Sequence, residues 1–165
     1  MNQVPSSLPQ IRLPNAPVLI ADQRGAVMLT TDGELITLDK EKAISQAKSF
    51  PPILCHAKAT ARYLKTQDFP AFDLLELFAF VRPAQFAVPT PRGLAEAFVL
   101  PRPDTPEEAA ETLFSITQSL LSELLTAEPR VYSLAWGMAQ AGWSWGPSVI
   151  AVLENNKPKR QPNSP

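Results

Sequence analysis

Cysteine and histidine are almost absent from this chain, whose 165 residues contain one of each, Cys55 and His56. A single cysteine excludes an internal disulfide and is typical of a reducing compartment. One cysteine and one histidine are also too few for a metal site built on these two ligand types. We therefore expect neither a disulfide framework nor a zinc-type centre.

Glycine-rich phosphate loops are lacking as well. The six glycines form neither a GxxxxGK[ST] loop nor a GxGxxG loop, so no nucleotide site of these types is present. No stretch approaches the roughly 20 apolar residues of a membrane span, and the first residues lack the apolar run of a signal peptide. These absences predict a soluble, cytoplasmic protein with no cofactor in this chain.

An excess of charge of one sign is also missing, because the formal net charge is −1. Domains that bind nucleic acid normally carry a basic face, so the total charge makes no case for DNA and leaves only a local basic patch open. Hydrophobic residues make up 45% of the chain and charged residues 19%, which excludes a disordered protein. The length suits one domain.

Proline, in contrast, is abundant, and its 18 residues are about twice the usual share. Most of them fall between periodic segments, where they separate predicted elements. We predict a flexible lead-in over residues 1–16, a folded domain over residues 17–154, and a linker or tail over residues 155–165.

Residues 17–38 predict a meander of three short strands. The first is an apolar run that ends at Asp22, and the third alternates between apolar and polar residues, as a half-buried strand does. Asp32-Gly33 is a strong signal for the hairpin between the second and third strands. At the end of the first strand, Asp22 is either a turn former or a metal ligand, and we favour the turn.

Helices dominate the rest of the chain, interrupted by one more short strand at residues 53–56. That strand runs directly into a helix, a geometry that places functional side chains at the carboxyl edge of a sheet. Capping residues followed by proline or an acid mark several helix starts. The predicted helices are residues 39–48, residues 57–65, three that begin after Asp73, Thr90 and Thr105, and residues 129–140 and 148–153.

Two residue pairs invite a functional interpretation. Cys55 and His56 are adjacent in a strand, so their side chains point to opposite faces and cannot form a catalytic dyad. We expect a buried cysteine beside a histidine at the strand end. Trp143 and Trp145 could stack on bases, although a tryptophan pair beside glycines more often closes a core.

The order of these elements resembles the RNase H-like fold of the proofreading-type 3′–5′ exonucleases, the DEDD or DnaQ-like family. FDLLEL at residues 72–77 resembles the family's DTLxLA helix start, and GLAEAF at residues 93–98 resembles its LxxLxxxFGL segment. His56-Ala57 resembles the start of its HNxxFD motif. The resemblance covers about residues 18–125. It implies an α/β fold with a mixed sheet, an N-terminal three-strand meander and a helical C-terminal half.

The catalytic residues of that family do not carry over. Its members need four carboxylates to hold two divalent cations. Where the first motif has Asp-x-Glu, this chain has Asp22 and, at the glutamate position, Arg24. The aspartate position of the second motif falls at Ala61. The histidine of the third motif is missing, and Glu111 is the remaining candidate for the last carboxylate. The resemblance therefore implies a degenerate, inactive nuclease without a metal site.

A longer set of motifs is similar to the N-terminal region of alphaproteobacterial DinG-like ATP-dependent DNA helicases, in which an exonuclease-like domain precedes a superfamily 2 motor. The resemblance covers about residues 17–153 and implies a non-catalytic accessory domain that binds or positions DNA or docks the helicase motor. ATP and Mg²⁺ are implied only for that motor, whose nucleotide-binding loop and DEAH-type box this chain lacks. The motifs are FDLLELFAFVRP at residues 72–83, PTPRGL at residues 89–94 and GWSWGP at residues 142–147.

Four residues are the candidate contacts to DNA or to a partner: Arg82 and Arg92, which flank a proline-bounded segment and could touch phosphates, and Trp143 and Trp145. Two alternatives stay open. One is an active metal-dependent 3′–5′ exonuclease, which the missing carboxylates disfavour. The other is a stand-alone protein-interaction domain that never meets DNA, which the near-zero net charge allows.

Overall fold

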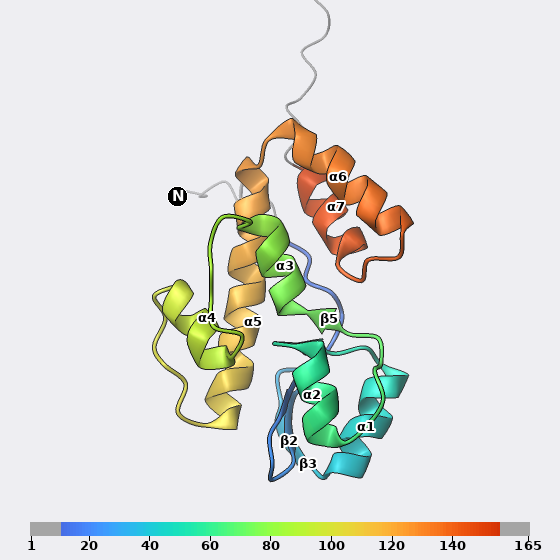
Figure 1. The fold of residues 1–165 in the computed structure, drawn as a ribbon, viewed down its shortest axis with the longest axis vertical. Coiled ribbons are helices and arrows are strands. Elements are labelled where there is room, and N and C mark those ends of the chain that lie inside the picture. The colour runs from blue at the N-terminus through green and yellow to red at the C-terminus, as the bar shows by residue number, and fades with distance from the viewer. Residues whose placement is uncertain (1–10, 156–165) are drawn as a thin grey trace, which may run out of the picture.

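Five short strands form one mixed sheet in the computed structural model, which describes residues 11–155 (Figure 1). Their order across the sheet is β3-β2-β1-β4-β5. Residues 1–10 of the lead-in predicted over residues 1–16, and residues 156–165 of the tail predicted over residues 155–165, lie outside the described residues. The strands are β1 Val18–Ala21, β2 Ala26–Leu29, β3 Leu35–Leu38, β4 Ile53–Leu54 and β5 Phe72–Asp73.

The predicted three-stranded meander is confirmed. β1 pairs antiparallel with β2, and β2 with β3, across a turn in which Gly33 has a φ of +88°. β4 pairs parallel with β1, and β5 pairs parallel with β4. Because parallel strands end at the same edge of a sheet, β1 and β4 bring their carboxyl ends together. β5 was not predicted, since two residues are too few to show a period.

Helices surround this sheet, and the helix starts predicted after Asp39, Asp73, Thr90 and Thr105 are confirmed. The side chains of Asp39, Asp73, Thr90 and Thr105 each accept a hydrogen bond from a backbone N–H in the first turn of the helix that follows. The helices within residues 11–155 are α1 Lys40–Ser49, α2 Ala57–Leu64, α3 Leu74–Val81, α4 Pro91–Ala97, α5 Pro106–Glu123, the 3₁₀ turn η1 Leu124–Thr126, α6 Pro129–Gln140 and α7 Gly146–Asn155.

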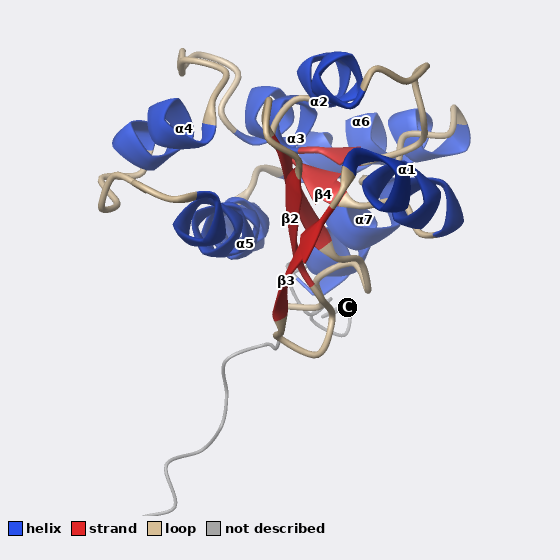
Figure 2. Cartoon of the chain, turned by 90° about the horizontal axis from the view of Figure 1, so that it is seen from below, coloured by secondary structure: helices blue, strands red, loops and turns tan. Residues whose placement is uncertain are grey.

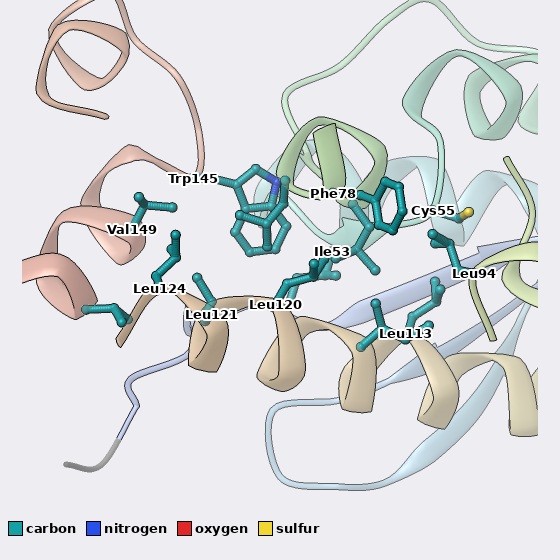
Figure 3. Packing of buried hydrophobic residues seen from close by; sticks show 14 of the residues in the cluster. Ile53, Cys55, Phe78, Leu94, Leu113, Leu120, Leu121, Leu124, Trp145 and Val149 are labelled. Carbon is teal, nitrogen blue, oxygen red and sulfur yellow. The ribbon is translucent and has the colours of Figure 1, made fainter. Parts of the chain in front are cut away.

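The two faces of the sheet are covered by different helices (Figure 2). Successive strand residues point to opposite faces, and Val18 and Leu19 accordingly belong to different hydrophobic clusters. Leu19 packs in the smaller cluster with Ala43 of α1 and Leu64 of α2. Val18 packs in the larger cluster, which α5 dominates and which extends to α3, α4 and α7 (Figure 3).

The helical pair α6–α7 closes the larger cluster at one end of the molecule (Figure 1). α7 begins at Gly146, inside the segment predicted as an aromatic turn, because glycine and proline fit the first turn of a helix. A Cβ at Gly146 would lie 2.6 Å from the Cβ of Ala139, so glycine permits the close approach of α7 to α6.

Candidate functional site

The carboxyl ends of β1 and β4 open into a pocket of about 220 Å³. Asp22 follows β1 and His56 follows β4, and both line this pocket. The structure therefore brings together two of the residues selected from the exonuclease resemblance. The other walls come from β1, from α2 and from the segment before α4, and comprise Leu19, Ile20, Ala21, Cys55, Ala59, Thr60, Tyr63, Pro89, Thr90 and Pro91.

Asp22 acts as a turn former, as we favoured. Its Oδ1 accepts hydrogen bonds from the backbone N–H groups of Arg24, at 2.8 Å, and of Gly25, at 3.2 Å. The side chain thereby closes the turn from β1 into β2. Arg24 itself is exposed and lines a separate hollow between this turn and the start of α5.

His56 caps α2 at the mouth of the pocket. Its Nδ1 accepts the backbone N–H of Ala59 at 3.1 Å, and the Thr60 hydroxyl donates to the His56 carbonyl oxygen at 2.8 Å. A neutral imidazole whose Nδ1 accepts carries its hydrogen on Nε2, which leaves Nε2 as a donor for a ligand. On the same helix Ala61 is buried and does not line the pocket.

Cys55, the residue before His56, is a buried free thiol, as expected. Its side chain is labelled in Figure 3. Burial, and secondarily the negative charge of Asp73, raise the pKa of this thiol to about 12. The thiolate is the nucleophilic form of cysteine, so Cys55 stays unreactive near neutral pH. It contributes a wall to the pocket and no chemistry.

Asp73 connects the first turns of α2 and α3 through hydrogen bonds. Its Oδ1 accepts the backbone N–H groups of Leu75 and Glu76 at the start of α3, at 2.8 and 3.3 Å. Its Oδ2 accepts the N–H of Ala57 at the start of α2, at 2.8 Å. A single buried carboxylate thus fixes the first turns of two successive helices, α2 and α3.

Trp145 is one of our candidate contacts, and the structure buries its side chain in the core. Its side chain is 0% exposed in the larger cluster (Figure 3). Its ring packs edge-on against Phe72 with centroids 5.2 Å apart. Its Nε1 donates to the carbonyl oxygen of Asp73 at 2.7 Å. A buried ring cannot stack on a base, so Trp145 closes the core.

Trp143 also has a structural role, although it remains partly exposed. Its Nε1 donates to the Glu76 carboxylate at 3.2 Å, and its ring lies 5.0 Å from that of Phe80. Burial, with a smaller effect from Asp73, raises the pKa of Glu76, while the hydrogen bond from Trp143 opposes this rise. The two tryptophans together attach the α6–α7 pair to β5 and α3.

Arg82 and Arg92 both interact within the chain. Arg82 forms an ion pair with Glu123 at 2.9 Å, and its guanidinium lies over the Phe98 ring, 4.1 Å from the centroid. Arg92 is exposed, and its Nε donates to the Pro103 carbonyl oxygen at 3.1 Å. These contacts hold α4 and its flanking loops in place, and a role in DNA binding stays a prediction.

Glu111 is not brought to the carboxyl-edge pocket. It lies on the exposed side of α5 and lines a different hollow with Arg102 and Glu108. Within residues 11–155, no group of three or more His, Cys, Asp or Glu side chains is placed to hold a metal ion. The described part of the pocket offers one carboxylate, one imidazole and hydroxyl groups, a set suited to hydrogen bonding with a ligand.

Sequence reasoning missed two parts of the pocket wall. Thr60 and Tyr63 come from α2, which the sequence predicted as a helix without indicating that one side of it borders a cavity. Pro89, Thr90 and Pro91 come from a segment far along the chain, and no local pattern could place them beside β1 and β4.

Comparisons of the chain with protein-family models, with curated proteins and with solved structures found no match. The function is therefore argued from the site itself. Among the helices of residues 11–155, none is both long enough and apolar enough to cross a membrane.

Proposed function

We propose that this chain is a non-catalytic, exonuclease-like accessory domain that binds or positions DNA, of the kind that precedes the motor in DinG-like helicases. One observation carries the proposal. The carboxyl ends of β1 and β4 open into a pocket that Asp22 and His56 both line. Each of these side chains accepts a hydrogen bond from a backbone N–H in the turn that follows its strand.

The element order supports the RNase H-like part of the proposal. A three-stranded meander is followed by a helix, then by a strand that runs directly into a helix, and then by a helical C-terminal half. This is the order that the exonuclease resemblance implies. The pocket lies where the first and second motifs of that family would meet.

The donor set supports a binding function over catalysis. Two-metal hydrolysis needs several carboxylates that converge on a pair of cations. Among the described residues that line the pocket, Asp22 is the one carboxylate, and one of its oxygens already accepts two backbone N–H groups. Ala61 is apolar and buried, and Glu111 lines another hollow.

A protein-interaction domain is the second candidate, and one observation favours it. Helix α6 exposes Leu134 at 59% and Trp136 at 50%, one on each side of the buried Ala135. Exposed tryptophan is enriched at the centre of protein interfaces. Such a domain would bind its partner without a salt-sensitive affinity for DNA, which separates the two candidates.

A nuclease assay tests the non-catalytic claim. The purified chain is incubated with a DNA that carries a labelled single-stranded 3′ tail, in Mg²⁺ or in Mn²⁺. We expect the label to keep its full length with both the parent chain and the Asp22→Ala variant. Metal-dependent shortening by the parent chain that Asp22→Ala abolishes would establish the active exonuclease instead.

A further inference from the structure

The near-zero net charge conceals a strong segregation of charge along the chain. Residues 40–65 contain six of the 15 Lys and Arg residues but only one of the 16 Asp and Glu residues. This segment therefore carries a net charge of +5, and the remainder of the chain carries −6. A surface with such an excess is the electrostatic footprint of a site for a polyanion.

These six cations lie on α1 and α2 or at their ends, and the two helices pack side by side over one face of the sheet (Figures 1 and 2). All six are exposed except Lys40, which is half-exposed. Neither of the ion pairs found within residues 11–155 involves them. We call these six residues together the α1–α2 basic face: Lys40, Lys42, Lys48, Lys58, Arg62 and Lys65.

The α1–α2 basic face adjoins the carboxyl-edge pocket through α2. Lys58 and Arg62 are exposed one helical turn apart on this helix, while Ala59, Thr60 and Tyr63 of the same helix line the pocket. Tyr63 is 44% exposed. One helix thus offers cations on one side and an accessible aromatic ring on the other.

We infer that single-stranded DNA lies along the α1–α2 basic face, with phosphates on Lys58 and Arg62 and a base against Tyr63 at the mouth of the pocket. The inference rests on the proposed function and assigns it residues other than Arg82 and Arg92. A single strand fits because its backbone tracks a basic surface while its unpaired bases stack on aromatic rings.

The apolar sides of these helices favour DNA over an anionic membrane. A helix that lies in a membrane interface exposes its apolar face to the lipid. In α1 and α2 that face is buried against the sheet, since Ala43, Ala47 and Leu64 belong to the smaller cluster. The residues that the two helices expose are charged or polar, apart from Tyr63.

Binding of fluorescent oligothymidylate across a salt series tests the inference. The variant is Lys58→Gln with Arg62→Gln, because both residues are exposed and glutamine suits a helix. Each phosphate contact contributes about 0.7 to the slope of log affinity against log salt for single strands. We expect the double variant to bind about tenfold more weakly at low salt and to lose about 1.4 from that slope.

Matched variants separate a site from a general charge effect. Arg102→Gln with Arg130→Gln removes the same charge from exposed positions elsewhere, and we expect its affinity to stay within about twofold of the parent. Tyr63→Leu should weaken binding about tenfold without changing the salt slope, because stacking releases no counterions. If the α2 variant does not fold, as judged by circular dichroism, Lys42→Gln with Lys48→Gln on α1 is tested in its place.

The outcomes separate this inference from the proposed function. Salt-sensitive binding by the parent chain with an unchanged α2 variant would overturn the α1–α2 basic face and leave the DNA-binding proposal standing. Equal losses in the α2 variant and the matched control would also overturn it. Absence of oligothymidylate binding by the parent chain, or tighter binding to phosphatidylserine vesicles, would overturn both.

Discussion

Asp73 illustrates how one side chain can set the geometry around the pocket. Its carboxylate accepts three backbone N–H groups from two helices, and its carbonyl oxygen accepts the indole N–H of Trp145. Asp73 is buried, so without its hydrogen bonds these N–H groups would have no water to replace it as a partner. Sequence predicted the cap on α3 from the local pattern, but it could not predict the bond to Ala57, which comes from another helix.

Replacing Asp73 should therefore cost more than replacing an ordinary cap. We expect Asp73→Ala to lower the free energy of unfolding by about 3 kcal/mol, since it leaves three backbone donors unsatisfied. Asp39→Ala, at the exposed cap of α1, should cost about 1 kcal/mol. Urea denaturation of both variants measures the difference, and equal losses would refute the bridging role of Asp73.

Cys55 provides a second prediction at the scale of one residue. Its pKa is raised to about 12 from the ordinary 9.0, so the native thiol should react with a disulfide reagent at pH 8 only as fast as the protein opens. The unfolded thiol ionises first, so the contribution of Cys55 to stability is complete below pH 9.0 and is lost as pH rises toward 12. Rapid labelling of the folded protein would contradict this account.

Among the elements, the helices follow from local sequence and the pocket does not. Threonine or aspartate caps, with proline or an acid in the first turn, predicted where α1, α3, α4 and α5 begin, because these signals act within a few residues. The contact of the α3–α4 loop with the pocket depends on tertiary packing, which no local signal encodes. The same is true of Glu111, whose orientation on α5 directs it to a different hollow.

Two glycines test how the α3–α4 loop is held. A methyl group at Gly93 would overlap the Val88 carbonyl oxygen and lie 2.6 Å from the Val88 Cβ, whereas one at Gly137 on α6 would meet nothing within 4 Å. We expect Gly93→Ala to destabilise the protein by about 2 kcal/mol through overpacking. Gly137→Ala should stabilise it by about 0.5–1 kcal/mol.

Thermal and urea unfolding of the two glycine variants provides the comparison. Because residues 89–91 line the carboxyl-edge pocket, Gly93→Ala should also weaken any ligand bound there. A neutral effect of Gly93→Ala on stability would mean that Val88 moves without cost and that the loop is not fixed against α4.

For the molecule as a whole, the distribution of charge matters more than its sum. The net charge of −1 made no case for DNA, yet it combines a basic segment over residues 40–65 with an acidic remainder. A ligand bound to the basic segment feels little of the more distant acidic charge, because salt screens exposed charges beyond roughly 10 Å. The sequence leaves a local basic patch open, and the packing of α1 beside α2 brings together the two helices that carry these cations.

We propose that this chain holds DNA without cutting it. The most direct test is a titration of fluorescent DNA with a single-stranded 3′ tail, in EDTA, Mg²⁺ or Mn²⁺ and over a salt series, followed by denaturing electrophoresis of the same samples. We predict binding that weakens with salt, that is equal with and without metal, and that leaves the DNA at full length. Metal-dependent shortening, or no binding even at low salt, would contradict the account.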